Sequence, residues 1–459
     1  MAKLLHFCGP GGRGKSTLSA NIATASAIDG NKTLYIDFDS QPTGQIIFGN
    51  YFNNGDKNGF SVGALVDVIQ TIDDIPSVKI DDHTVDETEL DEYLSNLEED
   101  LHCQIEKEGL TPEDNKISVE KSAELRESIC RHYMNKLKRS TQCGNLDLIL
   151  NDRGSDKISN INEKTEKKIA DYITSLDYDV IVIDAKAGND YHVSQWWNRA
   201  DINVMIGEPG KDYKERIQSA IIALQKRKLR DAISAFSKSN QEYGKTMSNL
   251  GRDIDLKKAS GIYADAFKRN LDSLENEVKS SMGTSKGWKA KIKEKAAIDI
   301  LGMINGYKER IDKEDIADLV NDFHHVYSKN DKLKKFSSPD TEIFNFLRGL
   351  YDSTKVCILM NRIGEEAIDE KELNSDREEG MNISEEIIKN SRDFLSIDAF
   401  YPYETYDNLK KPLFPLYEPG IIKNSLNAGI PFVVKYENSD ISGTIKKIAK
   451  YLVEYGGKK

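Results

Sequence analysis

Short runs of mostly apolar residues recur along the chain and alternate with segments of a different spacing. Three such runs lie at residues 4–8, 33–38 and 178–183, and their length is typical of buried strands in a parallel sheet. Between the first two runs, apolar side chains recur with helical spacing at Leu18, Ile22 and Ala25. The alternation of strand and helix predicts an α/β fold, with a mostly parallel sheet and helices on both of its faces.

Two longer segments carry only helical spacing and are predicted to be inserted into this core. The first, at about residues 71–140, contains a stripe made of Leu90, Leu94, Leu97 and Leu101. The second, at 229–350, contains one made of Phe267, Leu271, Leu274 and Val278. Such stripes usually pack inside small helical bundles. We therefore predict a first core part at 1–228 that holds the 71–140 insertion, an all-α subdomain at 229–350 and a second core part at 351–459.

The charge of the chain is unevenly distributed. The 459 residues carry a formal net charge of −12, which argues against nucleic-acid binding by the surface as a whole. Residues 73–127 hold 19 acidic and 5 basic side chains, whereas residues 226–335 hold 17 acidic and 24 basic ones, a net charge of +7. The second insertion is therefore predicted to dock a protein partner, and its basic charge also admits a nucleic acid.

Cysteine content and hydropathy restrict the class of protein further. The five cysteines form no C-x-x-C pair, and the histidines provide no zinc-ligand spacing. No apolar run approaches the ~20 residues that a transmembrane helix needs, and no signal peptide precedes the first strand. We expect a cytoplasmic protein with no transmembrane segment.

A glycine-rich loop follows the first predicted strand and precedes the first predicted helix. Residues 9–16 read Gly-Pro-Gly-Gly-Arg-Gly-Lys-Ser, which fits the phosphate-loop pattern G-x-x-x-x-G-K-[ST] without a mismatch. Its glycines let successive backbone N–H groups point inward at a phosphate. Lys15 is expected to reach the β- and γ-phosphates, and the Ser16 hydroxyl to bind Mg²⁺. The loop predicts binding of a nucleoside triphosphate.

Acidic residues end the second and third apolar runs. Asp37 and Asp39 come at the end of one run, and Asp184 directly follows the other. Ligands bind at the carboxyl ends of strands in open α/β sheets. A hydrophobic strand that ends in a carboxylate has the form of a Walker B segment, so Asp184 is expected to hold Mg²⁺ directly or through water.

These segments together resemble the ParA/MinD-type ATPases, which form the deviant Walker A group. Residues 11–16 match the K-G-G-x-G-K-[ST] loop of that family except at its first position, and residues 37–39 match its D-x-D strand end. Residues 184–190 run parallel to its D-S-P-A-G-x-E segment. Further matching segments follow in the family's order at 200–206, 356–362, 400–404 and 427–431. The resemblance covers about half of the chain.

The resemblance implies a reaction and a set of site residues. The reaction is Mg²⁺-dependent binding and slow hydrolysis of ATP. ATP is expected rather than GTP because no N-K-x-D guanine signature follows Asn361. The implied nucleotide-binding residues are Gly11, Gly12, Arg13, Gly14, Lys15, Ser16, Thr17, Asn361, Arg362 and Pro402. The implied catalytic residues are Lys15, Asp39, which positions the attacking water, and Asp37, which supports the metal shell. The implied metal-binding residues are Ser16, Asp184 and Asp39.

One position departs from the family pattern. The family's signature lysine opens the loop and reaches the phosphate of the partner subunit in a nucleotide-bound dimer, but this chain has Pro10 there. Proline offers neither a charge nor a backbone donor. Arg13 inside the loop and Lys186 after the third strand are the candidate replacements.

The reading favoured by these observations is an ATP-dependent molecular switch that forms a homodimer or recruits a partner in its ATP state. Two alternatives stay open. One is a ligase or kinase-like enzyme on the same fold, which transfers the γ-phosphate to a small substrate. The other is a module that binds ATP without hydrolysing it.

Overall fold

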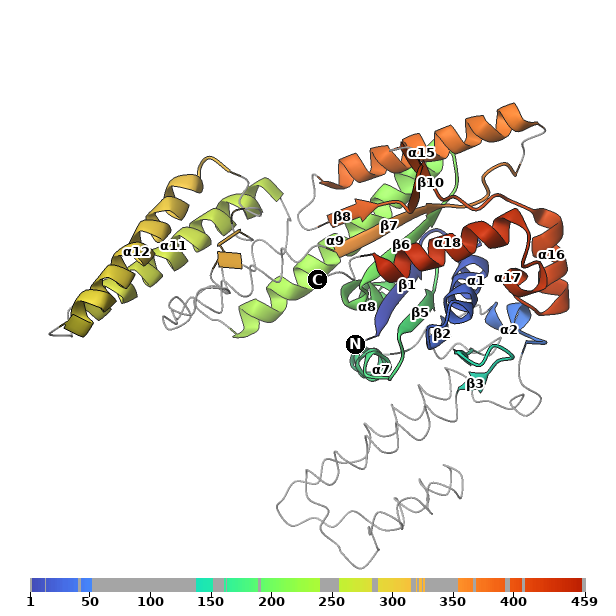
Figure 1. Cartoon of the computed structure of the whole chain (residues 1–459), viewed down its shortest axis with the longest axis horizontal. Coiled ribbons are helices and arrows are strands. Elements are labelled where there is room, and N and C mark those ends of the chain that lie inside the picture. Colours follow the sequence, from blue (N-terminus) through green and yellow to red (C-terminus); the bar gives the residue numbers. More distant parts are fainter. Residues whose placement is uncertain are drawn as a thin grey trace, which may run out of the picture. The chain divides into compact units, whose positions relative to one another are not determined.

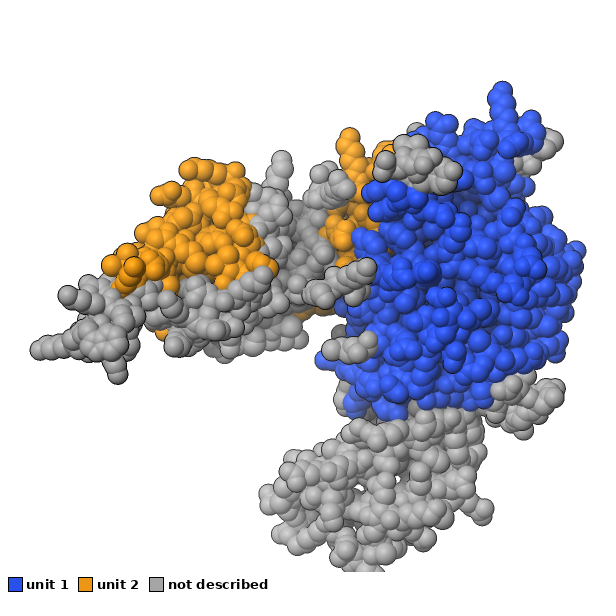
Figure 2. All heavy atoms as spheres, viewed as in Figure 1, with its two compact units in different colours: residues 1–217, 357–384, 401–459 blue, residues 218–356, 385–400 orange. Residues whose placement is uncertain are grey.

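The computed structural model describes most of the predicted core, with an eight-stranded sheet and a two-stranded hairpin (Figure 1). The described residues are 2–12, 14–39, 43–51, 138–151, 161, 163–188, 191–239, 256–282, 288–314, 319, 322–323, 325–326, 354–365, 369–392, 397–406 and 409–455. Two compact units divide the chain: unit 1 comprises residues 1–217, 357–384 and 401–459, and unit 2 comprises residues 218–356 and 385–400 (Figure 2).

The large sheet has the strand order β3–β4–β2–β5–β1–β6–β7–β8. Its strands are β1 (Lys3–Cys8), β2 (Thr33–Phe38), β3 (Arg139–Ser140), β4 (Leu146–Ile149), β5 (Val180–Ala185), β6 (Ile202–Gly207), β7 (Thr354–Met360) and β8 (Ile397–Phe400). β1 pairs in parallel with β5 and β6, and β2 with β4 and β5. β3 runs antiparallel to β4. The mostly parallel sheet is confirmed. Strands β9 (Tyr403–Tyr406) and β10 (Leu409–Pro412) form a separate antiparallel hairpin.

Helices pack on both faces of the sheet, as predicted. On one face, α7 (Glu163–Thr174) and α8 (Tyr191–Arg199) share a core with Leu34, Ile36 and Phe38 of β2. The side chains of the intervening β2 residues, Tyr35 and Asp37, point to the opposite face of the sheet, because successive side chains of a strand alternate between the two faces. There α1 (Lys15–Ile28) packs against α18 (Asp440–Glu454). Tyr35 and Asp37 of β2 therefore point toward the helix that follows the glycine loop.

The other described helices belong to unit 1, to unit 2 or partly to each. Unit 1 contains α2 (Gly44–Ile47), α16 (Pro419–Ala428) and α17 (Phe432–Lys435). Unit 2 contains α11 (Leu256–Met282) and α12 (Trp288–Arg310), which pack against each other. Helices α9 (Lys211–Ser239) and α15 (Glu370–Arg392) have residues in both units.

The helical stripe predicted in the second insertion forms part of a core. Phe267, Leu271, Leu274 and Val278 are buried. Some of the basic side chains are paired with acids, because Lys308 bonds to Asp272 and Glu275. The predicted domain boundaries stay a prediction. Residue 228, the predicted end of the first core part, lies inside α9. Residues 71–137 of the predicted first insertion lie outside the described residues. Among the helices described, none is long and apolar enough to cross a membrane.

Candidate functional site

The glycine loop between β1 and α1 has a backbone that glycine adopts most easily. Gly9, Gly12 and Gly14 have φ angles of 129°, 76° and 75°, all in the left-handed region. Gly9 also lies so close to β6 that a Cβ atom there would be 2.8 Å from the Ile206 carbonyl oxygen. Helix α1 begins at Lys15, so the positive end of its dipole lies at the loop. This arrangement suits the binding of a phosphate.

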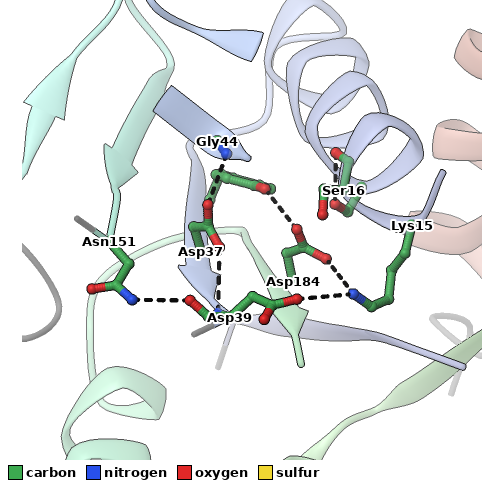
Figure 3. Close-up of polar contacts among 9 residues, drawn as sticks. Lys15, Ser16, Asp37, Asp39, Gly44, Asn151 and Asp184 are labelled. Carbon is green, nitrogen blue, oxygen red and sulfur yellow. Dashed lines mark hydrogen bonds and ion pairs between the residues drawn. The ribbon is translucent and has the colours of Figure 1, made fainter. Parts of the chain in front are cut away.

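Three carboxyl groups gather at the carboxyl ends of β2 and β5, close to the ammonium group of Lys15 (Figure 3). Asp37 and Asp184 are directly paired in the register of these strands, and Asp39 follows the end of β2. Lys15 Nζ lies 3.5 Å from Asp184 Oδ1 and 3.6 Å from Asp39 Oδ2. Burial lowers the pKa of Lys15, but the three acids outweigh that effect and raise it. The ammonium group therefore stays charged.

Asp37 is fully buried and is held by backbone donors. Its Oδ2 accepts a hydrogen bond from the Gly44 N–H at 2.8 Å, and its Oδ1 accepts one from the Asp39 N–H at 3.3 Å. Burial raises the pKa of Asp37 well above its ordinary value, the nearby Asp184 raises it further, and the backbone donors lower it. Asn151 Nδ2 donates to the Asp39 carbonyl at 2.9 Å. Asp37 and Asn151 thus fix the backbone that carries the Asp39 carboxylate.

The two oxygens of the buried Asp184 carboxyl group have different surroundings. Its Oδ2 accepts a hydrogen bond from the Tyr35 hydroxyl at 3.1 Å. Its Oδ1 lies against Lys15 but has no hydrogen-bond partner among the described residues. Burial raises the pKa of Asp184, and the Lys15 charge and the Ser16 hydroxyl lower it, with a net rise. Asp184 therefore keeps one oxygen directed toward Lys15, at the end of the glycine loop.

This set of side chains fits Mg²⁺ bound together with a nucleotide. Mg²⁺ prefers oxygen ligands, and in nucleotide sites it uses one or two carboxylates plus phosphate oxygens. Two oxygens of this kind are Asp184 Oδ1, which has no hydrogen-bond partner among the described residues, and the Ser16 hydroxyl on the first turn of α1. In the part of the chain that the structure describes, no group of three or more His, Cys, Asp or Glu side chains is placed to hold a metal without help from a ligand.

The end of β7 lies against the glycine loop. The Asn361 N–H donates to the Gly207 carbonyl at 2.8 Å. A Cβ atom at Gly14 would lie only 2.6 Å from Asn361 Nδ2. The next residue, Arg362, has a φ of 57°, a left-handed conformation that costs a residue with a side chain roughly 1–2 kcal/mol. Such strain is found where a side chain must be held in a particular place.

The Arg362 guanidinium spans from this strand end to the glycine loop. Its Nη2 donates to the Gly12 carbonyl at 3.1 Å. Its Nε lies 3.1 Å from Glu208 Oε1, and its Nη1 lies 3.3 Å from Glu365 Oε2. Its Cζ lies 5.7 Å from the centre of the Tyr417 ring. These contacts fix the guanidinium beside a loop carbonyl and tie the loop to β7.

The remaining predicted site residues lie as follows. Gly11 is next to Ala187, since a Cβ atom at Gly11 would lie 3.4 Å from the Cβ of Ala187. Thr17 is half-buried on the first turn of α1, and Lys186 is half-buried directly after β5. Pro402 is buried, and its carbonyl accepts a hydrogen bond from the Leu413 N–H at 2.8 Å. Arg13 lies outside the described residues.

Three residues of this site were not anticipated from the sequence: Tyr35, Gly44 and Asn151. Tyr35 lies in an apolar strand two residues before Asp37, so it shares a face with that acid. This spacing is the one signal that the sequence offers for Tyr35. The hydrogen bonds made by Gly44 and Asn151 depend on how distant segments fold back toward β2.

Residues 7–392 match the family described as the CobQ/CobB/MinD/ParA nucleotide binding domain. Among solved structures, the septum site-determining protein MinD from Pyrococcus horikoshii, complexed with Mg-ADP, is 11% identical with a TM-score of 0.44, over 100% of this chain and 98% of that one. A ParA family ATPase from Chlorobium tepidum is 12% identical with a TM-score of 0.41, over 98% of each chain. No curated protein matches the chain.

Proposed function

The chain belongs to the CobQ/CobB/MinD/ParA nucleotide-binding family, and from this premise we propose that it is an ATP-dependent molecular switch. It binds ATP with Mg²⁺, hydrolyses it slowly, and forms a homodimer or recruits a partner in its ATP state. The observation that carries the proposal is the position of Lys15 Nζ, which lies 3.5 Å from Asp184 and 3.6 Å from Asp39 next to the glycine loop. A buried cation between two carboxylates suits a triphosphate and its metal ion.

The glycine loop and Lys15 receive the phosphates in this proposal. Backbone N–H groups from Gly11 to Thr17 donate to phosphate oxygens, and Lys15 neutralises the β- and γ-phosphates. Lys15 is already desolvated, since only 7% of it is exposed. In this proposal, ATP binding replaces carboxylate contacts of the ammonium group with phosphate contacts. Most of the water has already left the ammonium group on folding, so ATP binding itself needs little further desolvation of Lys15.

Ser16, Asp184 and Asp39 are proposed to hold Mg²⁺, which when bound neutralises charge on the phosphate oxygens. Asp39 also positions the attacking water by accepting a hydrogen bond from it. Asp37 supports this task indirectly, because its Oδ1 accepts the hydrogen bond from the Asp39 N–H. Slow turnover suits a switch, whose ATP state must last long enough to find a partner.

The base of ATP is proposed to bind near the end of β7. Asn361 supplies an amide that can both donate to and accept from an adenine edge. Arg362 supports this position through its contacts with Gly12 and Glu208. Pro402 is proposed to line the same region, as the family resemblance implies.

Dimer formation in the ATP state requires a cation that compensates for phosphate charge at the interface. Because Pro10 supplies none, we propose that Arg13 or Lys186 takes this role. The helical part of unit 2 is proposed to dock the partner, which we take to be a protein. A duplex DNA titration at low and moderate salt tests the other possibility, because DNA binding by basic side chains weakens steeply with salt.

Phosphate release by the purified chain with Mg²⁺ and ATP tests the proposed function. A switch releases phosphate slowly, and the rate changes when its partner is added. Release that requires a small molecule, with a phosphorylated product detected by mass spectrometry, would instead identify a ligase or kinase-like enzyme. The third outcome is ATP binding without any release of phosphate. If this holds for the chain alone and also after addition of the proteins that bind it in ATP but not in ADP, the chain is a binding module.

A further inference from the structure

Tyr35 is a polar-tipped side chain in the middle of a buried strand. β2 reads Thr-Leu-Tyr-Ile-Asp-Phe, and every one of these residues is buried. A tyrosine at such a place needs a hydrogen-bond partner for its hydroxyl, because an unpaired buried hydroxyl is costly. The hydroxyl donates to Asp184 Oδ2, at 3.1 Å, and the Ser19 side chain also bonds to it.

The strand register explains how Tyr35 reaches Asp184. Tyr35 is paired with Val182, and Asp37 with Asp184. Tyr35 and Asp184 are therefore diagonal neighbours on the same face of the sheet, a separation that a long aromatic side chain can span. The Tyr35 ring also packs against Phe48, with ring centres 5.2 Å apart. A fully buried ring held in this way keeps its hydroxyl in one place.

The hydrogen bond from Tyr35 makes the surroundings of the two Asp184 oxygens different. Oδ2 is occupied by the Tyr35 hydroxyl, whereas Oδ1 faces Lys15 and has no hydrogen-bond partner among the described residues. If the hydroxyl were absent, the carboxyl group would keep the contacts with Lys15 and the Ser16 hydroxyl but lose the hydrogen bond that holds Oδ2 in place. Hydrogen bonds to the far side of a metal-binding carboxylate are known to orient it and to strengthen metal binding.

We propose that Tyr35 is a positioning residue that orients Asp184 Oδ1 toward Mg²⁺ in the ATP complex. This inference rests on the proposed function, in which Asp184 holds the metal ion. Tyr35 touches neither the phosphates nor the attacking water in this account and acts only through Asp184. Its removal must therefore weaken metal binding while leaving metal-free nucleotide binding unchanged.

The test compares Tyr35→Phe with Tyr178→Phe, which removes the same kind of bond elsewhere in the sheet. The Tyr178 hydroxyl donates to Asp147 Oδ2 at 2.7 Å, and Tyr178 lies before the start of β5, whereas Asp184 lies near its end. Mn²⁺, followed by electron paramagnetic resonance, is titrated into each variant with a non-hydrolysable ATP analogue. Affinity for the analogue is also measured in EDTA, and circular dichroism checks folding.

For Tyr35→Phe we expect the Mn²⁺ dissociation constant to rise about 10-fold or more, within the 10–100-fold range usual for such supporting groups. Affinity in EDTA stays as in the wild type, and Tyr178→Phe changes neither. In an Asp184→Asn background, Tyr35→Phe has no additional effect. If Tyr35→Phe does not fold, Tyr35→Met is used with the same expectation. A Mn²⁺ affinity within twofold of the wild type, or an equal loss in EDTA, overturns the inference. A wild-type chain that binds no analogue overturns the proposed function instead.

Discussion

Asp37 and Asp184 are directly paired residues of two neighbouring parallel strands, and both are fully buried. Burial raises the pKa of both carboxyl groups, and the charge of Asp184 raises that of Asp37 further. Lys15 offsets part of this cost from its place on the first turn of α1. With these carboxyl groups ionised, the site holds negative charge that Lys15 only partly neutralises. Such an excess of negative charge is expected of a site that binds a cation.

This pairing predicts a pH dependence of stability. A carboxyl group whose pKa is raised on folding binds its proton more tightly in the folded state, so stability falls as the pH rises above the ordinary carboxyl value of 3.8. Asp37→Asn removes one such group and should make the melting temperature fall less between pH 5 and pH 8. The exposed Asp29→Asn variant is the control. Thermal unfolding measures the melting temperature against pH. If it falls equally steeply for Asp37→Asn and the wild type, ionisation of Asp37 does not destabilise the folded state.

Asp39→Ala should slow hydrolysis far more than it weakens ATP binding, since Ser16 and Asp184 still hold the metal ion in this proposal. The backbone of Asp39 is held by Asp37 and Asn151, so the substitution removes the carboxylate without releasing the chain. Loss of a group that positions and polarises the attacking water typically costs about 10²–10⁴-fold in rate. Phosphate release under single-turnover conditions measures this effect. Hydrolysis at the wild-type rate would assign the task to another residue.

The sequence was sufficient to predict the core of the fold and the position of the phosphate loop. The apolar runs that end in acidic residues predict the strands of the core, and the glycine pattern predicts the loop between the first strand and the first helix. It was not sufficient for contacts that depend on register or on distant segments. The Tyr35 bond to Asp184 requires knowing that β2 lies beside β5. The Arg362 bond to Gly12 joins residues 350 positions apart, which no local pattern encodes.

Arg362→Lys should speed dissociation of ATP by roughly 10-fold, since a hydrogen bond to a charged group contributes about 1.5–3 kcal/mol. Lysine keeps the charge but cannot contact Gly12, Glu208 and Glu365 at once, because it lacks the planar fork of arginine. The Gly12 carbonyl is then free to move, and with it the loop. Stopped-flow release of a fluorescent ATP analogue measures the rate. The matched control is Arg377→Lys, at an arginine whose Nη1 bonds to Asn374 within α15. Equal rates for both variants would contradict a role for Arg362 in holding the loop.

Arg13→Ala or Lys186→Ala should weaken ATP-dependent dimerisation if either residue replaces the cation that Pro10 lacks. Phosphate charge at the interface would otherwise be uncompensated. Sedimentation velocity with a non-hydrolysable ATP analogue measures assembly, and Lys423→Ala on α16 serves as the charge-matched control. If both variants assemble like the wild type, this chain has lost the dimer mechanism that the family resemblance implies.

The most direct test of the central claim is the affinity of Lys15→Ala for ATP and Mg²⁺, measured by isothermal titration calorimetry beside the wild type. The control is Lys32→Ala, which removes an exposed lysine paired with Asp177. Because Lys15 is proposed to contact both outer phosphates, its loss should weaken ATP binding by about 100-fold, while Lys32→Ala binds normally. ATP affinity of the Lys15→Ala variant equal to that of the wild type would contradict the assignment of the glycine loop as a nucleotide site.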